Sequence, residues 1–251
     1  MSTIHPSLED FMKDADLNDP DVQYKIAECY NHGEGTERDL LKAYQWYQAA
    51  AENEHLEASY ELTEVIYELA HCFRYGGGVD KDPQTALDYL KEAANCGHMD
   101  AMYELWEIYK HGIGVDKDPQ TALEYLHDAA NYGHMDAKFE LWQIYKYGIG
   151  VNRDHDKAFR YLHDAADYGH MDAKFKLWEI YEHGIGVDKD HDKAFEYLHD
   201  AADFGHIYAK FKLWEIYEHG IGVDRDHDKA YKYLKDAADC GYEDAQDLLD
   251  M

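Results

Sequence analysis

The stretch AKFKLWEIYEHGIGV fills residues Ala173–Val187 and recurs letter for letter at Ala209–Val223, 36 residues later. Weaker copies lie at Ala101–Val115 and Ala137–Val151, and degenerate copies lie further upstream. A period of about 20–50 residues indicates one supersecondary unit stacked on copies of itself, because a single unit cannot bury its own hydrophobic face. The sequence therefore predicts a solenoid rather than a globule around one core.

Pairs of glycines separated by one residue set the register of the repeats. The first glycines of these pairs are 43, 36, 36, 36 and 36 residues apart. The longer spacing comes from a seven-residue insertion, visible because Tyr60-Glu61-Leu62 recurs as Tyr67-Glu68-Leu69. Seven residues make about two helical turns, so the second repeat should have a longer first helix with the same apolar face. The six predicted repeats are residues 18–53, 54–96, 97–132, 133–168, 169–204 and 205–240.

Each repeat contains the pattern of two helices. In the third repeat, apolar residues at helical spacing predict a first helix over 99–111, and Gly112 follows where a left-handed residue ends a helix. Asp118 and Pro119 have the residue types of an N-cap and a first helical position, so they predict the start of the second helix. The inner face of this second helix is expected to consist of Ala122, Tyr125, Leu126, Ala129 and Ala130.

Both ends of the chain resemble caps of the array. Residues 5–17 are expected to form a lone helix, with Phe11, Met12 and Ala15 in the inner positions. Residues 241–251 are expected to form another, in which Ala245 and Leu249 begin a first helix and Asp250 stands where earlier repeats have tryptophan. A charge at that position suits the polar end surface that terminal repeats need. We therefore predict one all-α domain over residues 1–251.

The recurring pattern Ala-x3-Leu-x3-Tyr-x2-Gly-x-Gly-Val-x2-Asp-x3-Ala-x6-Ala-Ala-x2-Gly resembles the Sel1-like repeats, relatives of the tetratricopeptide helical hairpins. In the third repeat the match rests on Ala101, Leu105, Tyr109, Gly112, Gly114, Val115, Asp118, Ala122, Ala129, Ala130 and Gly133. The resemblance implies a right-handed α/α superhelical solenoid, and it implies an adaptor or scaffold for other proteins.

The sequence departs from the family pattern at one recurring position. The family usually has a small residue after the leucine of the first helix, as Ala27 has here, and often a tryptophan in the second helix, as Trp46. Repeats 3–6 instead place tryptophan at the small position and tyrosine in the second helix. This exchange either conserves volume within one packing layer or exposes a tryptophan ladder that binds a partner. The tryptophans are Trp106, Trp142, Trp178 and Trp214, and the tyrosines are Tyr125, Tyr161, Tyr197 and Tyr233.

The composition limits the classes of partner. With 53 acidic and 24 basic residues the net charge is −29, which disfavours nucleic acid and anionic membranes and favours a basic partner. No apolar run is long enough to span a bilayer and residues 1–12 lack the pattern of a secretory signal, so we expect a cytoplasmic protein. Equivalent positions in successive repeats are too far apart for disulfides. The four cysteines are therefore expected to be small buried residues in a reducing compartment.

No group of residues stands apart from the repeat as a catalytic site. Most of the 17 histidines recur with the repeat, and the sequence has no Cys-x2-Cys or His-Glu-x2-His pair, so we expect no metal and no cofactor. The Gly-Ile-Gly-Val segments follow helices rather than strands, which disfavours phosphate binding. We expect a non-enzymatic protein.

Two alternatives stay open: a structural spacer or self-assembling rod, and, less favoured, a hydrolase of the peptidoglycan or β-lactam type that some relatives represent. The oligomeric state is open as well.

Likeness to tetratricopeptide hairpins implies a concave groove lined by four rows of residues from the first helices. Aromatic rings flanked by carboxylates would suit a basic or amphipathic segment of a partner protein. The alternative is that these rows only solvate the inner face and pack between repeats. The rows are Tyr103, Phe139, Phe175 and Phe211; Glu107, Gln143, Glu179 and Glu215; Lys110, Lys146, Glu182 and Glu218; and His111, Tyr147, His183 and His219.

Overall fold

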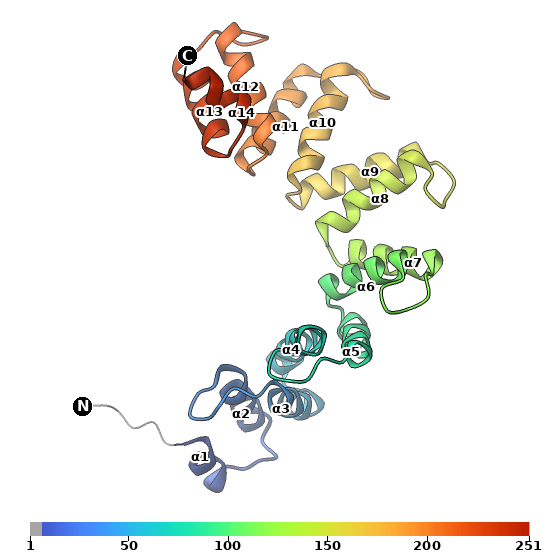
Figure 1. Cartoon of the computed structure of the whole chain (residues 1–251), viewed down its shortest axis with the longest axis vertical. Coiled ribbons are helices and arrows are strands. Elements are labelled where there is room, and N and C mark those ends of the chain that lie inside the picture. The colour runs from blue at the N-terminus through green and yellow to red at the C-terminus, as the bar shows by residue number, and fades with distance from the viewer. Residues whose placement is uncertain (1–6, 251) are drawn as a thin grey trace, which may run out of the picture. The chain divides into compact units, whose positions relative to one another are not determined.

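Fourteen α-helices and no strand make up the computed structural model over residues 7–250, the part of the chain that it describes (Figure 1). The helices fall into two compact units that divide after Tyr132. The N-terminal unit contains α1 (Leu8–Asp14), α2 (Pro20–His32), α3 (Leu40–Glu52), α4 (Leu56–Tyr75), α5 (Pro83–Asn95), α6 (Met99–His111) and α7 (Pro119–Asn131). The C-terminal unit contains α8 (Met135–Tyr147), α9 (His155–Asp167), α10 (Met171–His183), α11 (His191–Asp203), α12 (Ile207–His219), α13 (His227–Asp239) and α14 (Glu243–Leu249).

Within each unit the helices pack as successive hairpins. The hairpins are α2 with α3, α4 with α5 and α6 with α7 in the N-terminal unit, and α8 with α9, α10 with α11 and α12 with α13 in the C-terminal unit. The second helix of a hairpin also packs on the first helix of the next, as α5 does on α6 and α11 on α12. The prediction of an all-α repeat solenoid is confirmed. The right-handed sense and the single domain concern the whole array and stay predictions.

The ends of the helices follow the predicted signals. The predicted first helix of the third repeat is α6, and the Asp118 side chain caps α7 by accepting backbone N–H bonds from residues 120 and 121. Gly112 has φ +72°, a left-handed conformation in which its N–H donates to the carbonyl of Ile108 at 2.8 Å. The insertion also has the predicted effect, because α4 is 20 residues long while the other first helices have 13.

The interior is a layer of alanines and leucines that recur with the repeat. Ala173 and Leu177 of α10 are fully buried, as are their counterparts in the neighbouring hairpins. Trp106, Trp142 and Trp178 are only 5%, 5% and 9% exposed, so these tryptophans belong to the packing layer. Trp214 is half-buried. The replacement of the family's small residue by tryptophan is therefore mainly a repacking of the interior.

The two terminal helices agree with the predictions in part. At the C-terminal end, Ala245 of α14 is buried, Leu249 packs beside it and Asp250 is exposed, as predicted. At the N-terminal end, α1 starts at Leu8 and ends at Asp14, and Ala15 already has an extended backbone. Leu8 is the buried residue of α1 and Phe11 is 40% exposed, so the predicted inner position of Phe11 was wrong, while Met12 and Ala15 are half-buried. Residues 5, 6 and 251 of the predicted cap helices lie outside the described residues.

All four cysteines are free, as the spacing predicted. Their predicted burial was wrong for Cys96 and Cys240, which are exposed because they occupy the C-cap positions of α5 and α13. Cys29 and Cys72 are half-buried within helices α2 and α4.

Candidate partner-binding surface

The aromatic row lies on the first helices α6, α8, α10 and α12, and its rings are half-buried. In each helix the ring centroid is 4.8 Å from that of the tryptophan three residues later. Phe139 also stacks on His170, and Phe175 on His206, both at 4.2 Å. Phe139 and Phe175 therefore join successive repeats of the C-terminal unit, which is the packing role that the sequence left open as an alternative. The row consists of Tyr103, Phe139, Phe175 and Phe211.

The histidines on which these rings stack are the N-caps of the first helices. Nδ1 of His170 accepts the N–H of Ala173 at 3.2 Å, and Nε2 lies 3.4 Å from an oxygen of Asp136 in the preceding hairpin. His206 repeats this arrangement with Asp172 at 3.3 Å. Because Nδ1 accepts a hydrogen bond, the neutral ring carries its proton on Nε2, which faces the carboxylate. The recurrence of these histidines in the sequence did not predict their use as caps, because histidine is an uncommon N-cap residue.

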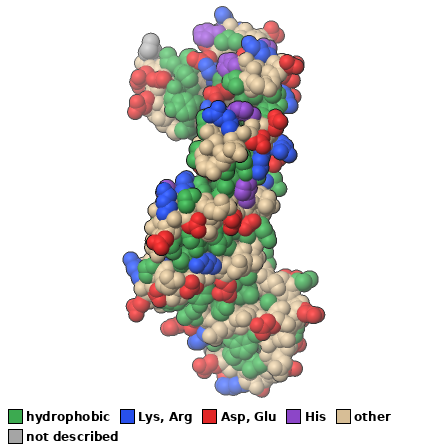
Figure 2. Space-filling model, turned by 90° about the vertical axis from the view of Figure 1, so that its right-hand side faces the viewer, with side chains coloured by type: hydrophobic (Ala, Val, Ile, Leu, Met, Phe, Trp, Pro, Cys, Tyr) green, Lys and Arg blue, Asp and Glu red, His purple; other side chains and the backbone are tan. Residues whose placement is uncertain are grey.

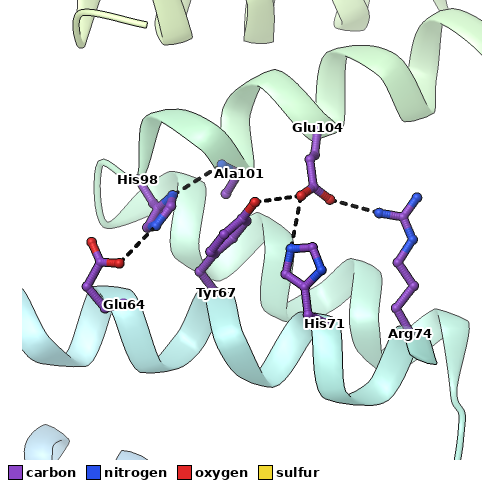
Figure 3. Close-up of polar contacts among 7 residues, drawn as sticks. All are labelled: Glu64, Tyr67, His71, Arg74, His98, Ala101 and Glu104. Atoms are coloured by element: carbon purple, nitrogen blue, oxygen red, sulfur yellow. Dashed lines mark hydrogen bonds and ion pairs between the residues drawn. The ribbon is translucent and has the colours of Figure 1, made fainter. Parts of the chain in front are cut away.

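The N-terminal unit contains the same arrangement at the junction of α4 and α6 (Figure 3). His98 accepts the N–H of Ala101 at 3.2 Å, stacks on Tyr67 at 4.1 Å, and places Nε2 at 3.5 Å from Glu64. Because this arrangement of the N-cap histidine recurs in both units, it is a general way in which one repeat is joined to the next.

Beside His98, three side chains of α4 converge on one carboxylate of α6 (Figure 3). Glu104 accepts the hydroxyl of Tyr67 at 2.6 Å, and its oxygens lie 2.9 Å from Nε2 of His71 and 2.8 Å from Nη1 of Arg74. His71 and Arg74 hold the positions that Glu107 and Lys110 hold one repeat later. In this repeat the face is thus basic, and Tyr67 and Arg74 donate hydrogen bonds to Glu104 within the unit.

A second set of histidines bridges tyrosines of the following hairpin. His163 lies 3.3 Å from the hydroxyl of Tyr181 and 3.2 Å from that of Tyr197. His199 forms the same bridge one repeat later, to Tyr217 and Tyr233, each at 3.2 Å. Burial is the main cause that lowers the pKa of both histidines, and burial also lowers the pKa of His170 and His206.

These lowered pKa values predict that mild acid destabilises the C-terminal unit. The unfolded chain takes up protons on these histidines near pH 6.5, while the folded chain takes them up only at lower pH. Stability is therefore complete above about pH 6.5 and is lost as the pH falls from there through the folded pKa values. Asp136 and Asp172 oppose the loss, since they favour the charged forms of His170 and His206, but burial outweighs them.

We expect the urea midpoint, followed by circular dichroism, to be lower at about pH 5.5 than at about pH 7.5, where carboxylates stay ionised. The double variant His163→Gln, His199→Gln should show a smaller difference between the two values. An equal or higher wild-type midpoint at the lower pH would contradict the prediction.

The carboxylates of the second row are partly neutralised by their own helices. Lys176 pairs with Glu179 at 2.7 Å in α10, and Lys212 pairs with Glu215 in α12. The spacing of three residues between lysine and glutamate was the available sequence signal. Glu107 is exposed and Gln143 is uncharged, and because lysines of the same helices offset Glu179 and Glu215, the net negative charge around this row is smaller than its glutamates alone suggest.

The side chains of the third row change from basic to acidic along the chain. Nζ of Lys110 lies 4.1 Å from the ring centroid of Trp106, and Nζ of Lys146 lies 4.7 Å from that of Trp142. In α10 and α12 the same position is glutamate: Glu182 is 2.9 Å from Nδ1 of His191, and Glu218 is 2.9 Å from Nδ1 of His227. The pKa of the Glu218 carboxyl is lowered, chiefly by the hydrogen bond with His227.

The fourth row lies at the C-terminal ends of the first helices, and all its members are exposed. His183 and His219 end α10 and α12, where a cation is favourable to the helix dipole. The row consists of His111, Tyr147, His183 and His219.

Two equivalent pockets open between successive hairpins of the C-terminal unit. The larger one, of about 640 Å³, lies between α10, α11, α12 and the loop after α12. The second, of about 540 Å³, lies one repeat earlier at equivalent positions. The larger pocket is lined by Trp178, Glu182, His183, His191, Asp192, Phe195, Lys212, Glu215, Ile216, Ile221, Gly222 and Val223. The pockets thus bring together members of the second, third and fourth rows.

Charged side chains of both signs are interspersed with hydrophobic ones on the face in view in Figure 2. Among residues 7–250, no three histidine, cysteine, aspartate or glutamate side chains come together in a way that could hold a metal ion. Over the same residues, no helix has the length and apolar character needed to cross a membrane.

The Sel1 repeat family model matches the chain six times, at residues 20–55, 63–98, 100–134, 137–170, 173–206 and 208–242. The chain belongs to the Sel1 repeat family. The gap between the first two Sel1 repeats contains the inserted residues 56–62, which form the first two turns of α4.

Two solved structures of Sel1 type are similar over nearly the whole chain. A Sel1 repeat protein from Oxalobacter formigenes shares 29% identity with a TM-score of 0.68, covering 93% of each chain. A protective antigen of uropathogenic Escherichia coli with an SLR fold shares 26% identity with a TM-score of 0.71. That match covers 96% of this chain but only 50% of the antigen's length. Comparison with curated protein sequences gave no significant match.

Sel1 repeat proteins generally mediate protein–protein interactions and are generally not catalytic. In the C-terminal unit of this Sel1 repeat protein, Phe139 and Phe175 stack on N-cap histidines of the next hairpin, while members of the second, third and fourth rows line the two pockets.

Proposed function

We propose that this chain is a non-enzymatic interaction module that binds a basic or amphipathic segment of another protein. The binding surface would consist of the larger pocket and the members of the third and fourth rows on helices α10 and α12 of the C-terminal unit. The four free cysteines favour a reducing compartment such as the cytoplasm.

The larger pocket is the observation that carries the proposal. Trp178, Phe195 and Ile221 give it an apolar wall that could hold a hydrophobic side chain. Its charged lining has three carboxylates, from Glu182, Asp192 and Glu215, against one lysine. An apolar cavity beside excess negative charge complements a segment in which hydrophobic and basic residues are adjacent, and the charge would steer its approach.

A pair of labelled peptides tests the proposal by fluorescence anisotropy at physiological salt. One peptide alternates leucine with arginine, and its partner has glutamate in place of every arginine. We expect the basic peptide to bind and the acidic one not to bind, because the net charge of the chain is −29 and the pocket lining is acidic.

Hydrogen–deuterium exchange locates the bound peptide. We expect protection of α10, α12 and the loop at 220–223, which surround the larger pocket. Equal affinity for the two peptides, or protection confined to the N-terminal unit, would contradict the proposal.

A further inference from the structure

In two repeats of the protein, a lysine side chain lies over the face of a tryptophan ring. In α6 and α8 a lysine four residues after the tryptophan places its Nζ over the ring, at 4.1 Å for Lys110 on Trp106 and 4.7 Å for Lys146 on Trp142. Lys146 also lies 5.1 Å from the ring centroid of Tyr147. A cation over an aromatic face is favourable because the ring carries negative charge there. In these two repeats the chain supplies the cation from its own sequence.

The next two repeats keep the tryptophan and lose the lysine. Glu182 and Glu218 occupy the lysine positions beside Trp178 and Trp214. The nearby rings of His183 and His219 replace Tyr147, and each lies 6.4 Å from the tryptophan ring, too far for close stacking. In place of the lysine, each of these repeats has a carboxylate four residues after the tryptophan, and a histidine of the same hairpin lies 2.9 Å from that carboxylate.

The charged residues that line the two pockets differ in the same way, with glutamate in place of lysine in the later repeat. The pocket of about 540 Å³ contains Lys146 and Lys176 against Asp156 and Glu179, so its formal charges balance. In the pocket of about 640 Å³, Glu182 replaces the first of these lysines, which leaves three carboxylates and one lysine. The larger pocket therefore has room and excess negative charge at the position where the smaller one has its own cation.

We propose that Trp178 with Glu182, and Trp214 with Glu218, are two cation subsites, each of which takes a lysine or arginine side chain of the bound segment. The partner supplies at these repeats the cation that Lys110 and Lys146 supply internally. Arginine suits the subsites better than lysine, because its planar guanidinium stacks on an indole while it donates two hydrogen bonds to a carboxylate. This inference rests on the proposed function and names the side chains that the segment must carry.

Exchanging residues between equivalent repeats tests the subsites. Glu182→Lys recreates the arrangement of Lys146 on Trp142, so the variant should fold and fill its own subsite. We expect its affinity for the leucine–arginine peptide to fall about tenfold. Lys146→Glu makes the reverse change and should raise the affinity about threefold, because it opens one more subsite.

Glu196→Lys is the matched control for charge. Glu196 is exposed on α11, and the preceding repeat has Arg160 at the same position, so a basic residue is tolerated there. It changes the net charge by the same amount as Glu182→Lys, and we expect less than a twofold loss of affinity. Melting curves by circular dichroism check that the variants are folded, and Glu182→Gln, which removes the charge without filling the subsite, should give an intermediate loss.

Equal losses for Glu182→Lys and Glu196→Lys would overturn the subsites, since binding would then follow net charge alone. In that case the proposed function still stands if the wild-type chain prefers the basic peptide. If the wild-type chain binds neither peptide, the proposed function itself fails. The two failures are therefore distinguishable.

Discussion

Leu177→Ala is expected to lower the free energy of unfolding by about 2–5 kcal/mol. Leu177 is 0% exposed at the centre of α10, and leucine occupies the same fully buried position in the neighbouring first helices. Truncation removes buried methyl groups and leaves a cavity that the closely packed hairpins can only partly fill. In a solenoid each repeat is stabilised by its neighbours, so the loss should spread to the contacts of α10 with α9 and α11.

Urea unfolding followed by circular dichroism measures this loss. Glu196→Ala serves as the control in the adjacent helix, because its side chain is exposed and the change should stay within about 0.5 kcal/mol. A loss below about 1 kcal/mol for Leu177→Ala would mean that α10 does not pack as described.

His206→Ala is expected to cost about 2 kcal/mol, because it removes both an N-cap and a buried ring. Nδ1 of His206 accepts the N–H of Ala209 at 3.1 Å, and the ring stacks on Phe175 of the preceding hairpin at 4.2 Å. Alanine leaves the first N–H groups of α12 without the side-chain acceptor and leaves Phe175 without its stacking partner.

His206→Asn separates the two effects. Asparagine is among the best N-cap residues, so it should restore the cap while the stacking stays lost. We expect it to recover about half of the stability lost by His206→Ala in the same urea experiment. Equal losses for the two variants would show that the cap contributes nothing, and no loss for either would contradict the joining role of the histidine.

These variants also test whether the residues that hold the hairpins together differ from the residues that bind a partner. Phe175 and His206 join one hairpin to the next, whereas Glu182 lines the pocket together with His191. We therefore expect Leu177→Ala and His206→Ala to change stability, and Glu182→Lys to change binding at nearly constant stability. The nearly identical repeats make this separation measurable, because each variant has a natural counterpart one repeat away.

The candidate surface was predicted from the sequence only in part. The rows were predicted on the first helices, and those helices lie where they were expected. The sequence left open whether the aromatic row binds a partner or packs between repeats, and in the structure Phe139 and Phe175 stack on histidines of the next hairpin. The cations over Trp106 and Trp142, and the partners of Glu182 and Glu218, had no separate signal in the sequence.

The repeat, the hairpins and the ends of their helices can be derived from the sequence alone. These follow from local rules that act within one repeat, such as helical spacing, Asp118 as a cap and the left-handed Gly112. Which side chains face one another across a repeat boundary depends instead on how the hairpins pack in three dimensions. His170 stands 34 residues from Asp136 and 31 from Phe139, and only the packing of α8 and α10 brings them together. A periodic sequence specifies which residues recur, but the contacts between copies depend on the angle and distance at which the hairpins pack.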